Sequence, residues 1–556
     1  PPPRALFRRK HRASHHKQHR NLACGRVVEV ALNFLLLGTW HHKLSFTFRF
    51  PTLPLKRLNL PSLPNPLPST MPEAGGGTKT SHAVVVEPGT FEIENHYYPR
   101  CLNAQRHPLV SSFMGLSNKA IAKRYCHLNP HTDEDALLEL LSTPKKFFKW
   151  AGSDLFCVTD NSGKKQMIVV ETNSCPSGNK SLPLVQDTVD MDSNYHMLIK
   201  RAFWPAVQAF GGEGALAVVY DKNHMEASGY AAAMADIADE PVYLATWKDT
   251  DPDPPSRIVD RQLQVRKADG TWINVRAAYR YVTQKPWTRI PPVLEKSLIF
   301  NPIVCCLAGG RNKMCADKAY EFFNHKNFNT GVTIRTPVTI RDVHKREVPI
   351  WVKSMGGFAV VKVPYGNAGQ GVYTICSPEE LKDFMDTDHH YDKFIVQSLV
   401  GNHSWSSDFK GKKYYHTGTV PSTKGLTHVT DLRFMLYSTE KGFKVASMYA
   451  RRAADPLTKR APVGTESWGQ LGTNLSIKLG DNQWDTDTRR LLLMDSRDFN
   501  KLGLGIDDLI DGYIQTVASV SAIDDMAGEL MSKGKFDREL YGSVNSDQAL
   551  LDEIVE

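Results

Sequence analysis

The sequence lacks paired cysteines. Its nine cysteines are scattered over 556 residues, and no CxxC pair occurs among them. This use of cysteine is typical of a reducing compartment and argues against a disulfide framework. A hydrophobic run long enough to cross a membrane is also missing. The apolar piece at residues 27–40 has at most 14 residues, and Glu29 and Asn33 interrupt it. We therefore expect a cytoplasmic protein with no membrane partner.

A basic surface is absent from most of the chain, although the formal net charge is +9. Residues 1–72 hold twelve Lys or Arg and a single acid, Glu29, so the remaining 484 residues sum to −2. The globular part has no overall basic footprint, and we expect no nucleic acid as a partner. The apolar content of 41% allows a large core, and the length suggests about three or four domain-sized units.

Residues 1–75 differ from the rest of the chain. They are rich in Arg and His at the front and in Pro and Leu around residues 51–68. The chain begins at Pro1, and its first methionine is Met71. One interpretation is a basic, acid-poor organelle transit segment, which would place the protein in mitochondria. The other, which we favour, is an extension upstream of a true start at Met71. With either interpretation we expect this segment to be disordered.

The first informative pattern is the segment AVVKVPYGNAGQGVYT at residues 359–374. A β-branched run leads to Lys362, a proline then stops the strand, and Gly366, Gly369 and Gly371 follow. Glycines let the backbone turn sharply and approach a ligand, so such a loop can surround a polyphosphate with N–H groups and one ammonium. No Walker motif or dinucleotide fingerprint matches, because no GK[ST] follows and the glycine spacing differs. A plain glycine-rich turn is the alternative interpretation.

A second pattern lies in the segment GSDLFCVTDNSGKKQMIVVETNSCPSGNK. The turn D-N-S-G separates two strand-like runs, so residues 154–159 and 166–172 are predicted to form an antiparallel hairpin. Asp154 begins one strand, and Glu171 and Asn173 end the other on a single face. Two carboxylates and an amide oxygen that converge there would suit Mg²⁺, which keeps its other positions for water and phosphate oxygens. A solvated hairpin end is the alternative.

Together the two patterns resemble the ATP-grasp superfamily. Its members hold ATP between two antiparallel sheets, and most join a carboxylate to an amine or thiol through an acyl phosphate. Here the D…E-x-N-x-x-P pattern precedes the lysine and glycine loop by about two hundred residues. That order is similar to the circularly permuted members, which include eukaryotic glutathione synthetases. The resemblance implies an α/β (α+β) fold class, with a permuted ATP-grasp fold and a small inserted α/β domain on the substrate side.

The resemblance also implies a domain organisation after the first segment. A β–α–β pattern at residues 215–221, 225–237 and 241–246 resembles the small substrate-side domain. Helical spacing over residues 506–531 predicts a packing helix near the end of the chain. The expected units are a lobe with the metal hairpin at 76–200, the small α/β domain at 201–300, the nucleotide-binding lobes at 301–480 and a helical segment at 481–556.

Nucleotide contacts follow from the family's motifs. Two lysines would contact the phosphates while the glycine loop closes over them, and the strand at residues 393–400 resembles the hinge whose backbone pairs with adenine. The ribose contact stays unassigned, because no acid occurs after the hinge until Asp408. The residues expected to bind nucleotide are Lys318, Lys362, Gly366, Asn367, Gly369, Gln370, Gly371, Gln397, Ser398 and Leu399.

Arginines are expected to support the charge that develops during the reaction. Arg433 lies in a segment that resembles the family's D-[IL]-R strand. Arg451 and Arg452 face opposite sides of the next strand, and the sequence does not decide which of them points inward. Arg280 matches the first arginine of the family's YRR strand, although Tyr281 stands where the second would be. The expected catalytic residues are Arg433, Arg451, Asn474 and Arg280, and the expected metal ligands are Asp154, Glu171 and Asn173.

The implied function is an ATP-dependent carboxylate–amine ligase that releases ADP and phosphate. Its cofactors would be ATP and two Mg²⁺ ions, with Mn²⁺ as an alternative. Its partners would be a small-molecule carboxylate and an amine, such as an amino acid or a short peptide, and the oligomeric state is not determined. Two alternatives stay open: an ATP-grasp small-molecule kinase, and a nucleotide-binding pseudo-ligase with a scaffolding role. No cysteine or histidine is proposed as catalytic, because this chemistry needs no covalent enzyme nucleophile.

Overall fold

The computed structural model describes most of the chain after its first 80 residues. The described ranges are 81–184, 193–366, 369–417, 419–464, 467–480 and 483–555. The chain divides into two units, Pro1–Thr70 and Met71–Glu556, and every described residue belongs to the second. The segment 1–75 and Asn367 lie outside the described residues, and for 477–480 and 483–485 the backbone alone is described. No described helix is both long and apolar enough to span a membrane.

A seven-stranded antiparallel sheet carries the predicted hairpin. Its strands are β2 (Trp150–Asp160), β3 (Lys165–Ser174), β14 (Tyr414–His416), β15 (Thr419–Pro421), β16 (Thr427–Thr439), β17 (Gly442–Arg452) and β20 (Leu491–Leu492). The turn between β2 and β3 forms because the Asp160 carboxylate accepts hydrogen bonds from the N–H groups of Ser162 and Lys164, at 2.9 and 3.1 Å. The predicted hairpin is therefore confirmed. On its other edge β2 pairs with β16, so strands from distant parts of the sequence form one sheet.

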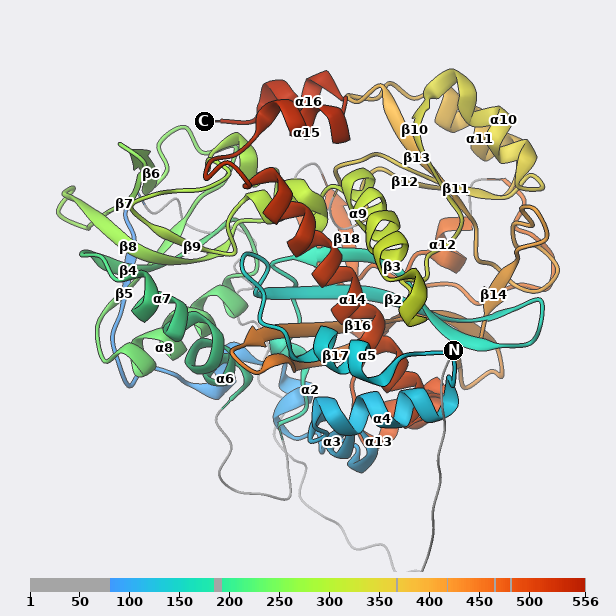
Figure 1. Ribbon diagram of the computed structural model, residues 1–556, viewed down its shortest axis with the longest axis horizontal. Coiled ribbons are helices and arrows are strands. Elements are labelled where there is room, and N and C mark those ends of the chain that lie inside the picture. Colours follow the sequence, from blue (N-terminus) through green and yellow to red (C-terminus); the bar gives the residue numbers. More distant parts are fainter. Residues whose placement is uncertain are drawn as a thin grey trace, which may run out of the picture. The chain divides into compact units, whose positions relative to one another are not determined.

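Helix α14 (Ile506–Leu530) lies across one face of this sheet, with α9 (Lys313–Lys326) beside it (Figure 1). The helix predicted over residues 506–531 is confirmed. It is buried along most of its length, including the polar Gln515 and Ser519. The Ser519 hydroxyl lies 3.1 Å from the Ser153 hydroxyl on β2, which satisfies both groups inside the core.

A second sheet has a parallel core and antiparallel extensions. Its strands are β1 (Val84–Val86), β4 (Ala215–Tyr220), β5 (Val242–Thr246), β6 (Ser256–Val259), β7 (Gln262–Arg266), β8 (Trp272–Tyr281) and β9 (Leu298–Phe300). β4 and β5 run parallel and are joined by α8 (His224–Ala238), as the β–α–β pattern predicts. β4 also pairs in parallel with β8, which brings the end of β8 next to the segment that follows β4.

A four-stranded sheet carries the glycine loop. Its strands are, in spatial order, β10 (Thr339–His344), β13 (Lys393–Ser398), β11 (Ala359–Lys362) and β12 (Val372–Ile375). Helices α10 (Val348–Ser354) and α11 (Pro378–Asp386) lie beside this sheet (Figure 1). β11 and β12 form a hairpin, and the glycine loop is its turn. β11 also pairs with β13, the expected hinge strand, so the loop and the hinge belong to one layer.

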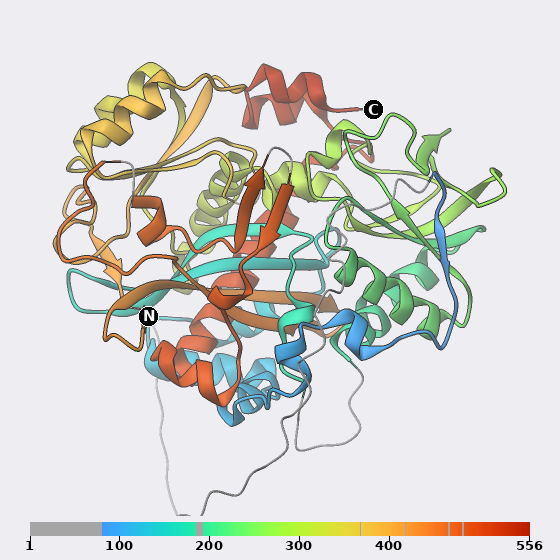
Figure 2. The same cartoon turned by 180° about the vertical axis from the view of Figure 1, so that it is seen from behind.

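The short hairpin of β18 (Ser476–Gly480) and β19 (Gln483–Thr486) stands on the face of the seven-stranded sheet opposite α14 (Figure 2). The remaining α-helices are α1 (Ile93–His96), α2 (Pro99–Leu102), α3 (Pro108–Met114), α4 (Asn118–Leu128), α5 (Glu134–Ser142), α6 (Asn194–Leu198), α7 (Trp204–Phe210), α12 (Ser467–Leu471), α13 (Ser496–Phe499), α15 (Arg538–Val544) and α16 (Gln548–Glu553). The predicted α/β class is confirmed. Circular permutation and the domain boundaries inside the second unit stay predictions.

Candidate active site

A cavity of about 270 Å³ is lined by both patterns found in the sequence. Elements of all three large sheets contribute to its wall, so the hairpin of β2 and β3 and the glycine loop reach the same space. The predicted site residues that line it are Asp154, Glu171, Asn173, Lys362, Gly366, Gly369, Gln397, Ser398, Leu399, Arg433, Arg451 and Asn474.

The three predicted metal ligands lie together because of the hairpin register. Asp154 lies opposite Glu171 across β2 and β3, and Asn173 lies two residues further along β3. Glu171 and Asn173 each have a cationic partner. Glu171 Oε1 lies 3.2 Å from Lys313 Nζ, and Asn173 Oδ1 accepts a hydrogen bond of 3.1 Å from Arg311.

Two arginines hold Asp154 in place. Arg433 donates from Nε and Nη2 to the two carboxylate oxygens, at 2.5 and 2.7 Å, and Arg451 Nη2 lies 2.9 Å from Oδ2. Burial alone would raise the pKa of Asp154, but the two guanidinium groups hold this pKa well below its usual range. Arg451 pairs in addition with Asp431. Asp154 is therefore an anionic anchor for two cations that face the cavity.

The oxygen atoms of this region fit Mg²⁺ only in part. Glu171 and Asn173 present oxygens to the cavity, which suits a Mg²⁺ ion that completes its shell with phosphate oxygens and water. Asp154 does not fit, because arginine nitrogens occupy both of its oxygens. We therefore correct the predicted set and keep Glu171 and Asn173 as candidate ligands.

Lys362 leaves β11 at the start of the glycine loop. Its side chain is buried, and its nearest acceptor is the Val170 carbonyl, 3.4 Å from Nζ. Burial lowers the pKa of Lys362 to about 8, against the opposing charge of Glu171 and with a contribution from Lys313. Lys313 Nζ in turn donates to the Gly366 carbonyl at 2.8 Å. Two lysines thus stand between the loop and Glu171, and an anionic ligand would stabilise both charges.

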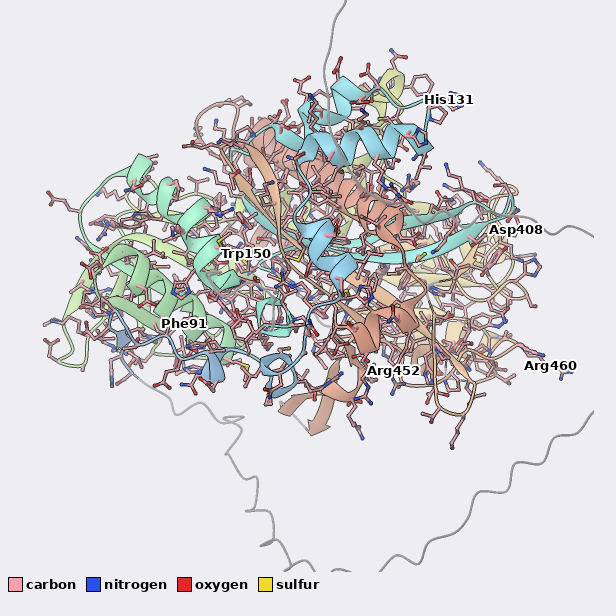
Figure 3. All side chains as sticks on the ribbon, turned by 90° about the horizontal axis from the view of Figure 1, so that it is seen from below. Phe91, His131, Trp150, Asp408, Arg452 and Arg460 are labelled. Atoms are coloured by element: carbon pink, nitrogen blue, oxygen red, sulfur yellow. The ribbon has the colours of Figure 1, made fainter. Side chains whose placement is uncertain are left out.

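The glycine loop touches the loop at residues 455–472. Gly369 has φ +79°, and a Cβ added there would lie 2.9 Å from Trp468 Cζ2. The Ser467 N–H, next to this tryptophan, donates to the Glu380 carboxylate of α11 at 3.2 Å. The two loops therefore contact each other. Arg460, in the exposed part of the second loop, points outward at the edge of the molecule (Figure 3).

The other end of the cavity is largely apolar. Its wall includes Phe156, Val360 and Val400 beside the hinge residues. His416 faces this space with only 7% of its surface exposed, and neither ring nitrogen has a hydrogen-bond partner. Burial lowers the pKa of His416 to about 3, so the ring is neutral at physiological pH. A neutral imidazole can donate one hydrogen bond and accept another from a ligand.

The backbone donors of the hinge are already used. Ser398 N donates to the Val338 carbonyl at 2.8 Å, and Leu399 N donates to the Ser407 hydroxyl at 2.6 Å. The Gln397 side chain donates to the Thr339 hydroxyl at 2.9 Å. Pairing with a base at this hinge would therefore use backbone carbonyls or would displace the Ser407 hydroxyl.

Solved structures with low similarity to the chain include an ATP-grasp protein and a ligase. No family model and no curated protein matches the sequence. A glutathione synthetase-like effector from Globodera pallida is 10% identical, with TM-score 0.34 over 62% of this chain and 83% of that chain. A RimK domain ATP-grasp protein from Sphaerobacter thermophilus is 10% identical, with TM-score 0.24 over 42% and 90%. A D-alanine–D-alanine ligase from Coxiella burnetii is 8% identical, with TM-score 0.22 over 58% and 98%.

At identities of 8 to 10% these likenesses locate no site, so the roles proposed below rest on the residues of the cavity.

Four residues that the ATP-grasp motifs implied do not line the cavity: Arg280, Lys318, Gln370 and Gly371. Arg280 is fully buried and donates to the Asn301 and Val282 carbonyls at 2.9 and 2.7 Å. Because side chains alternate along β8, the neighbouring Tyr281 reaches the cavity instead. We therefore correct Arg280 from a catalytic to a structural residue.

Lys318 also lies outside the cavity. Its Nζ donates to the Val544 carbonyl at 2.5 Å and lies 3.0 Å from the Asp342 carboxylate. Lys313, the first residue of α9, reaches the loop in its place. The sequence held one indication of this role for Lys313. Asn312 is an N-cap residue, so the residue after it begins the helix.

The ambiguity between Arg451 and Arg452 is settled by β17. Arg451 is buried and lines the cavity, whereas Arg452 does not line it and lies 3.4 Å from His428 Nδ1. Other basic residues were missed by motif reasoning because they lie outside the family's patterns. These are Lys180, Lys222, Arg311 and Lys313, and with them seven basic side chains and two acidic ones line the cavity.

Proposed function

We propose that the chain is an ATP-dependent ligase that joins a carboxylate to an amine through an acyl phosphate, with release of ADP and phosphate. The observation that carries the proposal is the arrangement within one cavity. Lys313 and Lys362 stand beside a glycine loop, face Glu171, and share the cavity with Arg433 and Arg451.

The phosphate end is formed by the glycine loop and the two lysines. Lys313 is already hydrogen-bonded to the loop at Gly366, so a shift of the loop moves the ammonium with it. Lys362 is buried without a strong partner, which favours an incoming anion. A bound Mg²⁺ ion would be held by Glu171 and Asn173 and would neutralise charge on the phosphates.

The reacting carboxylate would lie next to the arginines. Asp154 and Asp431 fix the guanidinium groups of Arg433 and Arg451 before any ligand binds. Donors held in this way stabilise developing negative charge without reorganisation, here the charge on the phosphoryl group and on the oxyanion. Asn474 lines the same space and is a further candidate donor.

An acyl phosphate must be protected from water. The contact between Gly369 and Trp468 joins the two loops over the cavity, so their closure can exclude solvent. We propose that adenine occupies the apolar end, against Phe156, Val360 and the hinge residues 397–399. The partners are a small-molecule carboxylate and an amine, the compartment is the cytoplasm, and the topology is the circularly permuted one.

One observation favours a second function, a nucleotide-binding pseudo-ligase. Asp154, which the family pattern implies as a metal ligand, is saturated by two arginines, and only Glu171 and Asn173 stay available to a metal ion. A site with fewer metal ligands would bind ATP and turn it over slowly, if at all.

The test uses the full-length chain with MgATP, hydroxylamine and pools of small carboxylates. Hydroxamate together with ADP supports the ligase. A stable phosphorylated product supports a kinase, and ATP binding without turnover in any pool supports the pseudo-ligase. Lys362→Met should reduce ADP formation by about a hundredfold or more. Lys318→Met is the matched control because Lys318 lies outside the cavity, and equal losses in both variants would refute the assignment of Lys362.

A further inference from the structure

The cavity has a basic end whose Lys and Arg side chains the proposed phosphoryl transfer does not use. It is formed by the residue before α2, the loop after β3, the residues that follow β4, the end of β8 and the segment before α9. The lining residues that matter here are Tyr98, Ser177, Lys180, Lys222, Tyr281 and Arg311.

Lys222 lines this end without a hydrogen bond or ion pair to any described residue. The neighbouring Asp221 does not neutralise it through direct contact, because its carboxylate accepts hydrogen bonds from the N–H groups of Thr283 and Gln284, both at 2.6 Å. Burial lowers the pKa of Lys222 to about 8. The charge of Asp221 opposes this shift, and the charges of Arg311 and other cavity cations add to it. The ammonium thus has other cations near it and makes no direct ion pair with a described residue.

Lys180 lies in a loop that is hydrogen-bonded to Glu226. Glu226 is fully buried and accepts from the Ser177 hydroxyl at 2.6 Å and from the Gly178 and Asn179 N–H groups at 2.7 and 2.8 Å. These bonds use the Glu226 carboxylate to position the loop, while Lys180 lies over the Tyr98 ring with Nζ 5.0 Å from its centroid. The lysine is 7% exposed and lines the cavity.

Arg311 and Asn173 complete the site. The Arg311 guanidinium donates to the Ser174 carbonyl at 2.7 Å and to Asn173 Oδ1 at 3.1 Å, which fixes its orientation. Asn173 itself is 5% exposed, and its Nδ2 has no hydrogen-bond partner. A buried amide donor without an acceptor is costly unless a ligand supplies one.

We propose that this basic end binds a second carboxylate of the substrate, so that the substrate is a dicarboxylate such as an acidic amino acid or an acidic peptide. The proposal rests on the proposed ligase function and names its substrate class. One carboxylate would be activated next to Arg433, and the other would pair with Lys222, Lys180 and the Asn173 amide. A polyamine is disfavoured as the occupant of this end, because it would place further positive charge beside three cations.

The experiment measures binding to the full-length protein by isothermal titration calorimetry, without ATP. Three dicarboxylates are each compared with the monoamide that replaces one carboxylate: succinate with succinamate, glutarate with glutaramate, and L-glutamate with L-glutamine. At least one dicarboxylate should bind about tenfold or more tightly than its monoamide, because a charge-assisted bond to Lys222 is lost in the monoamide. Ratios near one in all three pairs would overturn the proposal.

Variants test whether Lys222 causes the difference in affinity between dicarboxylate and monoamide. Lys222→Met should abolish the ratio between dicarboxylate and monoamide, Lys222→Arg should retain most of it, and Lys248→Met, an exposed lysine after β5, should leave it unchanged. A ratio that survives in Lys222→Met refutes the site, and so does tighter binding of O-phospho-L-serine than of L-glutamate. ATP binding is measured separately. If ATP does not bind while the ratio holds, the ligase proposal fails and the dicarboxylate site stands.

Discussion

Asp154 and Arg433 lie opposite each other on β2 and β16, and the arginine holds both carboxylate oxygens, at 2.5 and 2.7 Å. Arg451 adds a third contact to the same carboxylate at 2.9 Å. We expect Asp154→Asn to lower the free energy of unfolding by about 3 kcal/mol, because it leaves two buried guanidinium groups short of a counter-charge. Urea unfolding followed by circular dichroism measures the change.

The matched control is Asp386→Asn, which breaks the exposed ion pair between Asp386 and Lys382 on α11. Exposed pairs contribute little, so this variant should unfold at the wild-type urea concentration. An Asp154→Asn protein as stable as the control would show that the buried cluster does not stabilise the fold.

The second prediction concerns contact between the two loops. Gly369→Ala should weaken ATP binding by about tenfold, because a Cβ at φ +79° would collide with Trp468 at 2.9 Å and keep the loops apart. Gly357→Ala is the control, since Gly357 has φ +87° but no atom within 4 Å of the added Cβ. The Gly357→Ala variant therefore measures the effect of backbone strain without a collision.

Nucleotide affinity measured by calorimetry should therefore fall in Gly369→Ala and not in Gly357→Ala. Adding Trp468→Leu to Gly369→Ala should restore part of the affinity by removing the obstructing ring. Equal losses in the two single variants, or no recovery in the double variant, would contradict a role for the loop contact.

The correct expectations from the sequence are local ones. The D-N-S-G turn and the alternation of the flanking strands predicted the hairpin, because a tight turn sets the register of the strands that it joins. Lys362 and its glycines follow one another in the chain, so their common loop needed no knowledge of tertiary structure. The convergence of these two segments in one cavity came only from the family resemblance.

The expectations were wrong where the role of a residue depends on the direction of its side chain or on a partner far away in the sequence. Lys313 and Lys318 are five residues apart on α9, which turns their side chains about 140° from each other, and motif matching does not determine the rotation of a helix. Arg280 and Tyr281 are adjacent on a strand and face opposite sides of it. A motif match that is wrong by one position therefore selects the wrong face. Asp154 was interpreted as a metal ligand because its partners Arg433 and Arg451 come from strands far along the chain.

The third prediction concerns Cys175, a thiol in the cavity wall. It is 1% exposed, its Sγ donates to the Arg280 carbonyl at 3.0 Å, and burial raises its pKa to about 11. The thiolate that would act as a nucleophile is therefore disfavoured. We expect Cys175→Ala to keep hydroxamate formation within about threefold of wild type.

Alkylation gives an independent measure of the same thiol. Iodoacetamide at pH 8, read by mass spectrometry, should modify Cys126 before Cys175, because Cys126 is the one cysteine in the described ranges that is not buried. Rapid labelling of Cys175, or loss of turnover in a normally folded Cys175→Ala protein, would indicate that the thiol takes part in the reaction.

The last prediction follows from His416 on β14. Its pKa is lowered by burial to about 3, whereas a histidine in an unfolded chain has a pKa of about 6.5. Between these values the unfolded chain binds a proton that the folded protein does not, so stability falls as pH drops below about 6.5. From pH 7 to pH 5 the proton uptake of this histidine on unfolding should lower the free energy of unfolding by about 2 kcal/mol.

The variant His416→Phe cannot take up that proton. The difference in unfolding free energy, wild type minus variant, should therefore decrease by the same amount over this pH range. Urea unfolding at pH 7, 6 and 5 measures it, with the exposed His131→Gln as the control. A difference between wild type and His416→Phe that does not change with pH would mean that the ring is solvated or paired in solution, and the apolar end of the cavity would then be more open than the structure shows.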